Sequence, residues 1–264
     1  MVLGAFTSLR TSFAGLLVLL TLVLNVAAQT LGLALDKTAS DDASLVRYSA
    51  KLTFEQDAGV LFDDEQLYGL AKRAYEEMQT KFPADGVHVE AQPVMMAAMA
   101  VGNDVYLSSD LKGGPFLYTY TDTRLKPSVV LALERCQTSL QQNPDLPAGQ
   151  QYRTRASCAE VFARQQYYLD PDVSVEARQA PPPTRIVAYG RPSGQRGPVG
   201  PMSACGGGET MRNGVLTWGC KQFMADEGIT VPAPPKPAQV SLPDPFPPFT
   251  GKQISIICPG RQSK

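Results

Sequence analysis

Hydrophobic residues first recur at helical spacing after Phe62, where Asp63 and Gln66 have the spacing of a capping box. Pro83 and Gly86 end this pattern, since neither residue continues a helix readily. The sequence therefore predicts a first helix that ends before Pro83. Its apolar face is formed by Leu67, Leu70, Ala71, Ala74 and Met78.

Three further helices are predicted downstream. One begins at Pro127, a residue suited to the first helical position. Another begins at Ser157, because Ser157-x-x-Glu160 again has the spacing of a capping box. The last runs from about Cys220 to Glu227, with a glycine following as its C-terminal cap. The helix after Pro127 carries Val129, Val130, Leu133, Cys136 and Leu140 at helical spacing.

Strand signals lie between these helices. Two apolar runs, Val94–Val101 and Val105–Leu111, are separated by Gly102-Asn103-Asp104, residues that readily adopt turn conformations. They predict an antiparallel hairpin. Arg185–Tyr189 and Gln253–Cys258 are shorter strand candidates. Because strands alternate with helices, the pattern favours a layered α/β domain.

The remaining segments predict the domain organisation. Residues 29–61 show no firm period and are predicted to be an extended N-terminal lead-in. The stretch 191–219 is rich in glycine and proline and is predicted to be a loop. The proline-rich segment 231–248 is expected to be extended and largely polyproline-like. The main domain is therefore placed at residues 62–264.

Composition narrows the possible partners. The chain has 264 residues, of which 44% are hydrophobic and 19% charged, with a formal net charge of −1. This is enough for one domain with a sizeable core. The near-neutral balance argues against a nucleic-acid partner that is bound mainly through its phosphates.

The N-terminus has the pattern of a secretory signal. Arg10 precedes the apolar stretch Phe13–Leu24, and Val26-Ala27-Ala28 offers small residues for cleavage. The apolar stretch is shorter than the roughly 20 residues of a transmembrane helix. Residues 1–28 are therefore predicted to be a signal peptide, so that the mature chain is secreted and not attached to a membrane. An uncleaved membrane anchor is the alternative.

Cys158-Ala159-Glu160 is the most informative motif, together with the downstream Cys205 and Cys220. A metal-binding residue, a carboxylate two residues later and a distant cysteine pair are the elements of a zinc deaminase site. A catalytic zinc ion takes three protein ligands and keeps a fourth position for water or substrate. We therefore predict that Cys158, Cys205 and Cys220 converge on one zinc ion and that Glu160 transfers protons.

The order of these elements resembles the cytidine deaminase superfamily of zinc-dependent nucleobase deaminases. The resemblance covers most of residues 62–230, discontinuously. It implies a three-layer α/β/α sandwich around a mixed sheet of about five strands. It also implies hydrolytic deamination of a small-molecule amine, an amino-substituted nucleobase or nucleoside. Five segments carry the resemblance. The segment LYGLAKRAYEEMQTKFP (67–83) is similar to the family's N-terminal helix, and MMAAMAVGNDVYLSSDL (95–111) is similar to its first hairpin. The segment SCAEVF (157–162) is similar to the first metal-binding helix, RIVAY (185–189) to the strand before the second, and WGCKQFM (218–224) to the second metal-binding helix.

The chain also departs from the family pattern. Family cysteines of the second motif are two residues apart, whereas Gly206–Gly219 separates Cys205 from Cys220. This insertion would have to loop out while both sulfur atoms meet one metal ion. Nucleoside deaminases hold the ribose with Asn and Glu, and the aligned positions here carry Asp110 and Lys112.

Several residues have a second interpretation. Glu160 alone is explained by a capping box. Cys205 and Cys220 are also suited to a disulfide in an oxidising compartment. With three cysteines on zinc, Cys136 and Cys258 remain as a possible pair, or Cys136 as a buried thiol.

A second function class follows from these alternatives. The fold can persist without catalysis, so the chain can instead be an inactive secreted interaction or effector protein held by disulfides. His88-Val89-Glu90 also matches the His-x-Glu half of the deaminase signature, but no helix is predicted after it. We therefore do not expect His88 to be a ligand.

Overall fold

The computed structural model describes residues 30–114, 117, 126–142, 151–191, 197–205, 210–212 and 215–256. The predicted signal peptide, residues 1–28, and Cys258 lie outside these ranges. The chain divides into two compact units, Met1–Leu31 and Gly32–Lys264, and the second contains the elements below. None of the helices in the described ranges combines the length and the apolarity that a bilayer-spanning helix needs.

An antiparallel sheet forms the centre of the second unit. Within the described residues it has seven strands, in the order β1-β2-β4-β3-β6-β7, and β10 pairs with β2 beyond β1 along the same edge. The α/β class is confirmed, but the expected mixed sheet of about five strands is wrong. The strands are β1 (Ala34–Leu35), β2 (Tyr48–Phe54), β3 (Met95–Val101), β4 (Asp104–Ser109), β6 (Thr184–Gly190), β7 (Gly200–Met202) and β10 (Phe249–Lys252).

The predicted hairpin is confirmed. Strands β3 and β4 pair antiparallel, with Ala98 opposite Leu107. On its other side β3 pairs with β6, where Ala98 lies opposite Val187. The turn at Gly102 and Asn103 therefore fixes the register of the two strands on which the rest of the sheet is built.

Residues Ala34–Leu35 and Tyr48–Phe54 form two strands of the sheet, so the extended lead-in expected at residues 29–61 is wrong. Strand β2 pairs along its length with β4, between helix α2 (Lys37–Ala43) and helix α3 (Ala58–Leu61). Both faces of β2 are covered, and even Lys51 is buried. Because a strand covered on both faces does not alternate between polar and apolar residues, its sequence carries no period of two.

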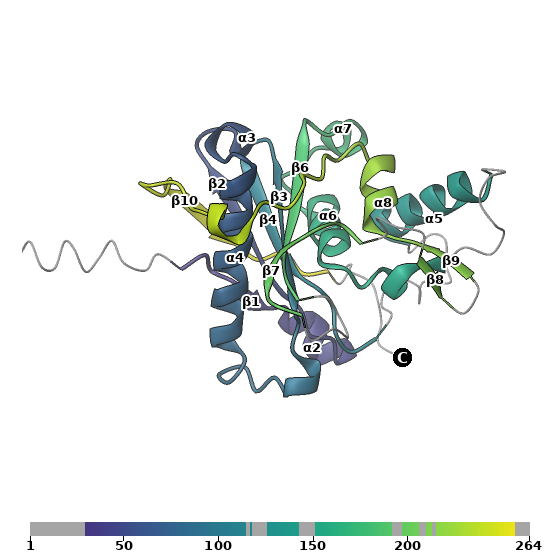
Figure 1. Cartoon of the computed structure of the whole chain (residues 1–264), viewed down its shortest axis with the longest axis horizontal. Coiled ribbons are helices and arrows are strands. Elements are labelled where there is room, and N and C mark those ends of the chain that lie inside the picture. The colour runs from purple at the N-terminus through teal and green to yellow at the C-terminus, as the bar shows by residue number, and fades with distance from the viewer. Residues whose placement is uncertain are drawn as a thin grey trace, which may run out of the picture. The chain divides into compact units, whose positions relative to one another are not determined.

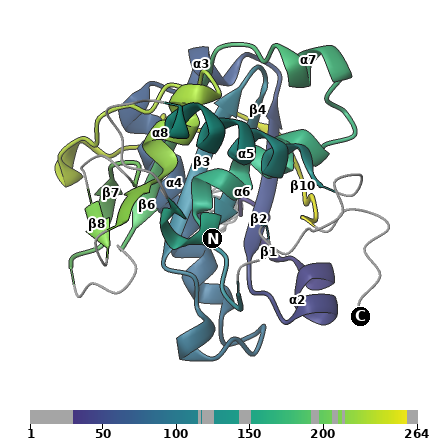
Figure 2. The same cartoon turned by 90° about the vertical axis from the view of Figure 1, so that its right-hand side faces the viewer.

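Helices cover both faces of the sheet. Figure 1 shows α4 on one side and α5, α6 and α8 on the other, and Figure 2 looks onto the side covered by α5 and α6. The alternation along β3 agrees, because Ala97 and Met99 pack with Phe162 of α6 while their neighbours point to the opposite face. The main helices are α4 (Asp64–Lys81), α5 (Ser128–Gln141), α6 (Ala159–Leu169), α7 (Val175–Gln179) and α8 (Cys220–Asp226).

The predicted starts of α4 and α5 and the predicted glycine cap after α8 are confirmed, whereas α6 begins at Ala159 and not at Ser157. Asp63 and Gln66 form the reciprocal capping box of α4, with hydrogen bonds of 2.8 and 3.0 Å. Helix α5 begins directly after Pro127. Helix α8 ends before Gly228, which has a φ of 67° and so takes a conformation that glycine adopts readily.

The glycine- and proline-rich stretch 191–219 contains strands, so its prediction as a loop is wrong in part. Besides β7 it holds β8 (Thr210–Arg212) and β9 (Val215–Trp218). These two strands form a hairpin, and β9 also pairs with the short β5 (Gln151–Tyr152). This small second sheet lies next to the predicted metal ligands.

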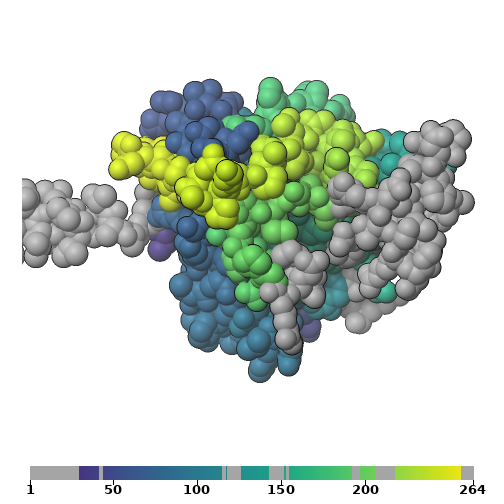
Figure 3. Space-filling view, in the orientation of Figure 1, coloured from purple at the N-terminus to yellow at the C-terminus, as the bar shows by residue number. Residues whose placement is uncertain are grey.

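The proline-rich segment 231–248 packs against α4. In the space-filling view it lies as a yellow-green band across the blue surface of the N-terminal part (Figure 3). A side chain at Gly69 would overlap the carbonyl group of Ser241, so glycine allows this close approach. The segment leads into β10 at Phe249–Lys252, whereas the strand was expected at Gln253–Cys258.

Candidate metal centre

Three cysteines from distant parts of the chain converge. The sulfur atoms of Cys158, Cys205 and Cys220 all lie within 4.8 Å of one another. Those of Cys158 and Cys205 are 3.5 Å apart. Two sulfur atoms that each lie about 2.3 Å from one tetrahedral zinc ion are separated by roughly 3.8 Å. The cluster could therefore hold a metal ion, and the predicted convergence of the three sulfur atoms is confirmed.

Each cysteine lies at a junction between two elements. Cys158 is the residue directly before α6, and the carbonyl oxygen of the preceding Ser157 accepts a hydrogen bond of 3.1 Å from the amide of Leu111, two residues after β4. Cys220 is the first residue of α8. Cys205 lies in the turn after β7. The ligands are therefore fixed by the sheet and by two helix starts, which are rigid parts of the fold.

Backbone amides at the start of α8 contact Cys205. The amide of Cys220 donates to the Cys205 sulfur at 3.2 Å, and the amide of Lys221 donates to the Cys205 carbonyl oxygen at 2.9 Å. A hydrogen bond to a sulfur atom stabilises its thiolate form, which is the form that binds metal. Cys205 and Cys220 are thus held together although they are distant in sequence.

The insertion between these two cysteines folds as the β8–β9 hairpin. Strands β8 and β9 pair antiparallel, and β9 ends directly before Gly219. Strand β9 pairs in parallel with β5, and Tyr152 lies opposite Trp218. This pairing places the segment before Cys158 beside the segment before Cys220.

Gly219 allows the closest approach in the cluster. A Cβ atom at this position would lie 2.7 Å from the Cys205 sulfur and 2.8 Å from the Cys205 carbonyl oxygen. Its φ of −157° is ordinary extended backbone, so the requirement for glycine is steric. Any larger residue would displace Cys205 from the start of α8.

Tyr152 lies beside Cys220 and packs against Trp218. The Tyr152 hydroxyl lies 3.0 Å from the Cys220 sulfur. The two rings pack edge to face, with centroids 4.6 Å apart. Burial, and then the charge of Cys158, raise the pKa of Tyr152, so its hydroxyl stays protonated. Sequence reasoning missed Tyr152, because only its contact with a residue far along the chain gives it a role.

The thiols themselves titrate together. The hydrogen bond with Cys205 raises the pKa of Cys158, and burial followed by the neighbouring thiols raises the pKa of Cys220. Three adjacent thiolates repel one another in a buried site. A bound cation reverses this effect, because a coordinating thiol is deprotonated outright.

Glu160 lies at the same cluster and is only 5% exposed. Burial, followed by the charge of Cys205, raises the pKa of its carboxyl group to about 7, although a hydrogen bond with Cys220 acts in the opposite direction. The capping box predicted for Ser157 and Glu160 is wrong, because Cys158 is the N-cap residue and makes no side-chain cap. The predicted capping role therefore does not explain why this glutamate is buried.

Two further polar groups surround Glu160. Asp110 accepts hydrogen bonds from the amides of Val94 and Met95 at 2.8 and 2.9 Å, and it pairs with Lys112 at 3.0 Å. Its charge is among the causes that raise the pKa of Glu160. Tyr68 of α4 donates to the carbonyl groups of residues 202 and 232 at 3.2 Å, and burial followed by the charge of Glu160 raises its pKa. Asp110 was identified from the sequence, but Tyr68 was not.

The other candidate residues lie elsewhere. His88 is exposed and does not belong to the cluster. Cys136 is buried on α5, and burial raises the pKa of its thiol to about 12, so it stays protonated. No disulfide joins the cysteines within the described residues, and the predicted Cys136–Cys258 pair involves a residue outside them.

Comparisons with known proteins give no relative. No family model, no curated protein and no solved structure matches this chain.

Proposed function

We propose that this chain is a secreted, zinc-dependent, deaminase-like hydrolase that acts on an amino-substituted nucleobase or nucleoside. One observation carries the proposal: three cysteine sulfur atoms lie within 4.8 Å of one another, with a buried carboxyl group at the same cluster. Three thiolates leave a fourth position for water or substrate. A carboxyl group beside that position is suited to proton transfer.

The donor set favours zinc. Soft thiolate ligands select zinc, copper(I) or iron–sulfur clusters, and a single ion with tetrahedral sulfur ligands is typical of zinc. Cys158, Cys205 and Cys220 would hold the ion. Zinc would supply Lewis-acid activation of a water molecule in a deaminase site. The amides that donate to Cys205, and the Tyr152 hydroxyl beside Cys220, reduce the negative charge of the thiolates by hydrogen bonding.

Glu160 transfers the protons of the reaction. Its carboxylate accepts a proton from the attacking water and delivers it to the ring nitrogen next to the amino-bearing carbon. Water oxygen then replaces the amino group, which leaves as ammonia, so the substrate amine and water give the oxo product and ammonia. Glu160 is not a metal ligand in this scheme. Its place at the second position of α6, directly after Cys158 and Ala159, keeps it near the metal end of that helix.

A three-layer, deaminase-like arrangement is part of this proposal. The β3–β4 hairpin lies beside β6, and helices cover both faces of the sheet. After α8 the chain returns to β6, where Thr230 forms an isolated parallel bridge with Arg185. A strand, a helix and a parallel return make the crossover unit of α/β folds. Two of the metal ligands, Cys158 and Cys220, then lie at the starts of α6 and α8, on one side of the sheet.

The residues near Glu160 favour a nucleobase over a nucleoside. Asp110 already accepts two backbone hydrogen bonds and pairs with Lys112. Nucleoside deaminases hold the ribose with an Asn and a Glu. This chain has Asp110 and Lys112 at the two aligned positions, so it lacks both residues. A small planar amine that does not require these contacts fits the site better.

Metal analysis and an ammonia-release assay test the proposal together. We expect about one zinc ion per purified chain, which Cys158→Ser removes. Turnover is measured on a panel of cytosine, adenine and guanine compounds. Glu160→Gln should lower it by a factor of about 10² to 10⁴, the usual contribution of a positioned acid–base group, while zinc stays bound. Glu90→Gln is the matched control, because Glu90 is exposed on the surface.

Two results would contradict the proposal in different ways. Ammonia release that survives Glu160→Gln would exclude the proton-transfer role. A chain without zinc and without activity on any amine of the panel would instead support the inactive interaction or effector protein.

A further inference from the structure

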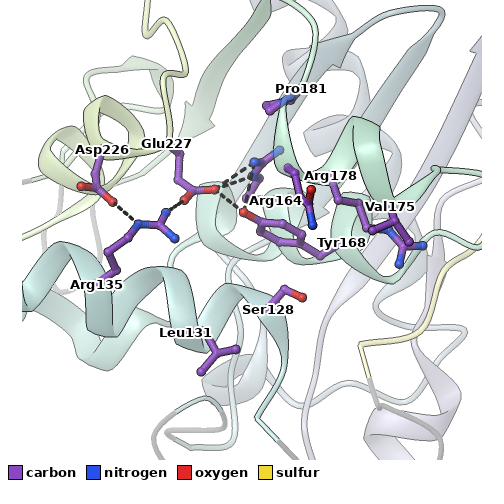
Figure 4. Close-up of a pocket in the computed structure, with 11 residues that line it drawn as sticks. Ser128, Leu131, Arg135, Arg164, Tyr168, Val175, Arg178, Pro181, Asp226 and Glu227 are labelled. Carbon is purple, nitrogen blue, oxygen red and sulfur yellow. Dashed lines mark hydrogen bonds and ion pairs between the residues drawn. The ribbon is translucent and has the colours of Figure 1, made fainter.

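A pocket lies near the C-terminal ends of α6 and α8, the helices that begin at the cysteine cluster. It has a volume of about 630 Å³ and is lined by residues of α5, α6 and α7 and by the end of α8. Arg164 and Tyr168 line it from α6, and Glu227 lines it after α8 (Figure 4). Because Cys158 and Cys220 lie at the first turns of these helices, the pocket is separate from the cysteine cluster.

The two carboxylates of this pocket already have partners. Glu227 accepts from Arg164 at 2.9 Å and from the Tyr168 hydroxyl at 2.5 Å, and it also pairs with Arg135. Asp226 pairs with Arg135 at 3.3 Å. Figure 4 shows the Glu227 carboxylate between the guanidinium groups of Arg135 and Arg164. Neither carboxylate therefore needs a further cation.

Two arginines keep buried donors without partners. Arg164 is only 2% exposed, yet its Nη1 has no hydrogen-bond partner among the described residues. The Nε of Arg178 is also buried without a partner there, while its Nη2 donates to the Asp170 carbonyl oxygen at 2.6 Å. Leaving a buried guanidinium N–H unsatisfied is unfavourable. Both arginines line the pocket, so an acceptor placed there lies next to guanidinium groups whose donors are not all used.

The same pocket exposes apolar side chains. Leu131 of α5 is 49% exposed and Val175 of α7 is 60% exposed, and both line the pocket. They are two of the four large hydrophobic residues that are exposed within the described ranges. An apolar group placed against them would leave water, which favours binding.

We propose that this pocket binds a small carboxylate with an alkyl or aryl chain. Its carboxylate accepts hydrogen bonds from the guanidinium groups of Arg164 and Arg178, and its apolar part packs against Leu131 and Val175. The charge of the lining supports a monoanion, because three arginines, Arg135 among them, face only two carboxylates. Planar guanidinium groups bind carboxylates in this way. The proposal does not depend on the deaminase activity.

Titration of the full chain with hexanoate and, separately, with inorganic phosphate tests the pocket. We expect hexanoate to bind at one site with a Kd on the order of 1 mM, a range suited to a ligand of its size. Phosphate, which has no apolar part, should bind more weakly. Arg178→Gln should weaken hexanoate binding about tenfold, the value of one charge-assisted hydrogen bond. Val175→Ser should weaken it severalfold without changing phosphate binding.

Matched controls separate the pocket from general effects. Lys72→Gln removes an exposed charge and Val60→Ser an exposed valine, both outside the pocket, so hexanoate binding should not change. Thermal melts verify that Arg178→Gln is folded. No saturable binding, or equal affinity for hexanoate in Arg178→Gln and the wild type, would refute the pocket. Tighter binding of phosphate than of hexanoate would refute the carboxylate assignment.

Discussion

Single residues decide how closely the three sulfur atoms approach. Gly219 has no side chain where one would meet both the sulfur and the carbonyl oxygen of Cys205. The amide of the next residue, Cys220, donates to that sulfur. The absence of a side chain at Gly219 therefore allows Cys205 to lie close to Cys220, although Gly219 itself is not a ligand.

Gly219→Ala should weaken zinc binding. The added methyl group would push Cys205 away from the other two sulfur atoms, and displacing a supporting group at a metal site costs about 10- to 100-fold in affinity. Competition with a zinc-binding dye measures the change. Gly197→Ala is the matched control, because a Cβ atom there meets nothing within 4 Å. Unchanged zinc affinity in Gly219→Ala would show that the cluster tolerates a shift of Cys205.

At the scale of elements, the β8–β9 hairpin explains how two distant cysteines can form a pair. The hairpin lies between the two ligands in the sequence, since Cys205 precedes it and Gly219 follows it. The contacts between Cys205 and the start of α8 are hydrogen bonds to the next two amides, which do not involve the hairpin. The metal site thus requires that the two ends meet, whatever the length between them.

Deletion of residues 206–217 should preserve zinc binding. The shortened chain reads Cys205-Trp218-Gly219-Cys220, a Cys-x-x-Cys spacing that is common in zinc sites. We expect one zinc ion per chain, with affinity within about tenfold of the wild type. Adding Cys220→Ser to the deletion should abolish binding and serves as its control. A folded deletion variant that binds no zinc would show that the pairing of β9 with β5 is itself required.

Local signals in the sequence predict some of these elements and not others. Helix α4 follows from its capping box, and the β3–β4 hairpin from its Gly-Asn turn and apolar runs. Strand β2 could not be predicted, because it is buried on both faces and carries Lys51 in the core. Strands β5, β8 and β9 are two to four residues long, and their pairing is set by the tertiary fold.

The candidate site was likewise predicted only in part. Cys158, Cys205, Cys220 and Glu160 were predicted because their residue types carry metal and acid–base chemistry. Tyr152 was not, because its hydroxyl acquires a role only through the contact with Cys220. The pocket at Arg164 was also missed, since its partner Glu227 lies directly after α8, far along the chain. Metal-binding and acid–base residues can thus be predicted from their residue types, whereas the residues that contact and support them are identified only from the three-dimensional structure.

At the scale of the whole second unit, one buried ion-pair network joins segments from both ends of the chain. Lys51 of β2 contacts Asp170 at 2.6 Å and Asp104 at 3.0 Å. The Tyr106 hydroxyl of β4 donates to Asp170 at 2.8 Å, and Lys252 of β10 contacts it at 3.0 Å. Asp170 caps the end of α6, so the helix that begins at Cys158 ends at this network.

The stability of the protein should therefore fall steeply in acid. Burial alone would raise the pKa of Asp170, but hydrogen bonds from Lys51 and Tyr106 outweigh it and lower the pKa to about 2. Because the folded pKa lies below the unfolded value of about 4, the stabilisation is complete above pH 4 and is lost as the pH falls towards 2. It amounts to about 2 kcal/mol. Urea unfolding between pH 2 and pH 6 measures it.

Asp170→Asn isolates this contribution, because the variant has no carboxylate to titrate at the network. It should be less stable than the wild type at pH 6, since Lys51 loses a buried partner, and its stability should vary less between pH 4 and pH 2. Asp172→Asn is the control, because Asp172 contacts the same two lysines but is 65% exposed and should change the pH dependence less. If Asp170→Asn lost as much stability in acid as the wild type, the acid-sensitive carboxylate would have to lie outside this network.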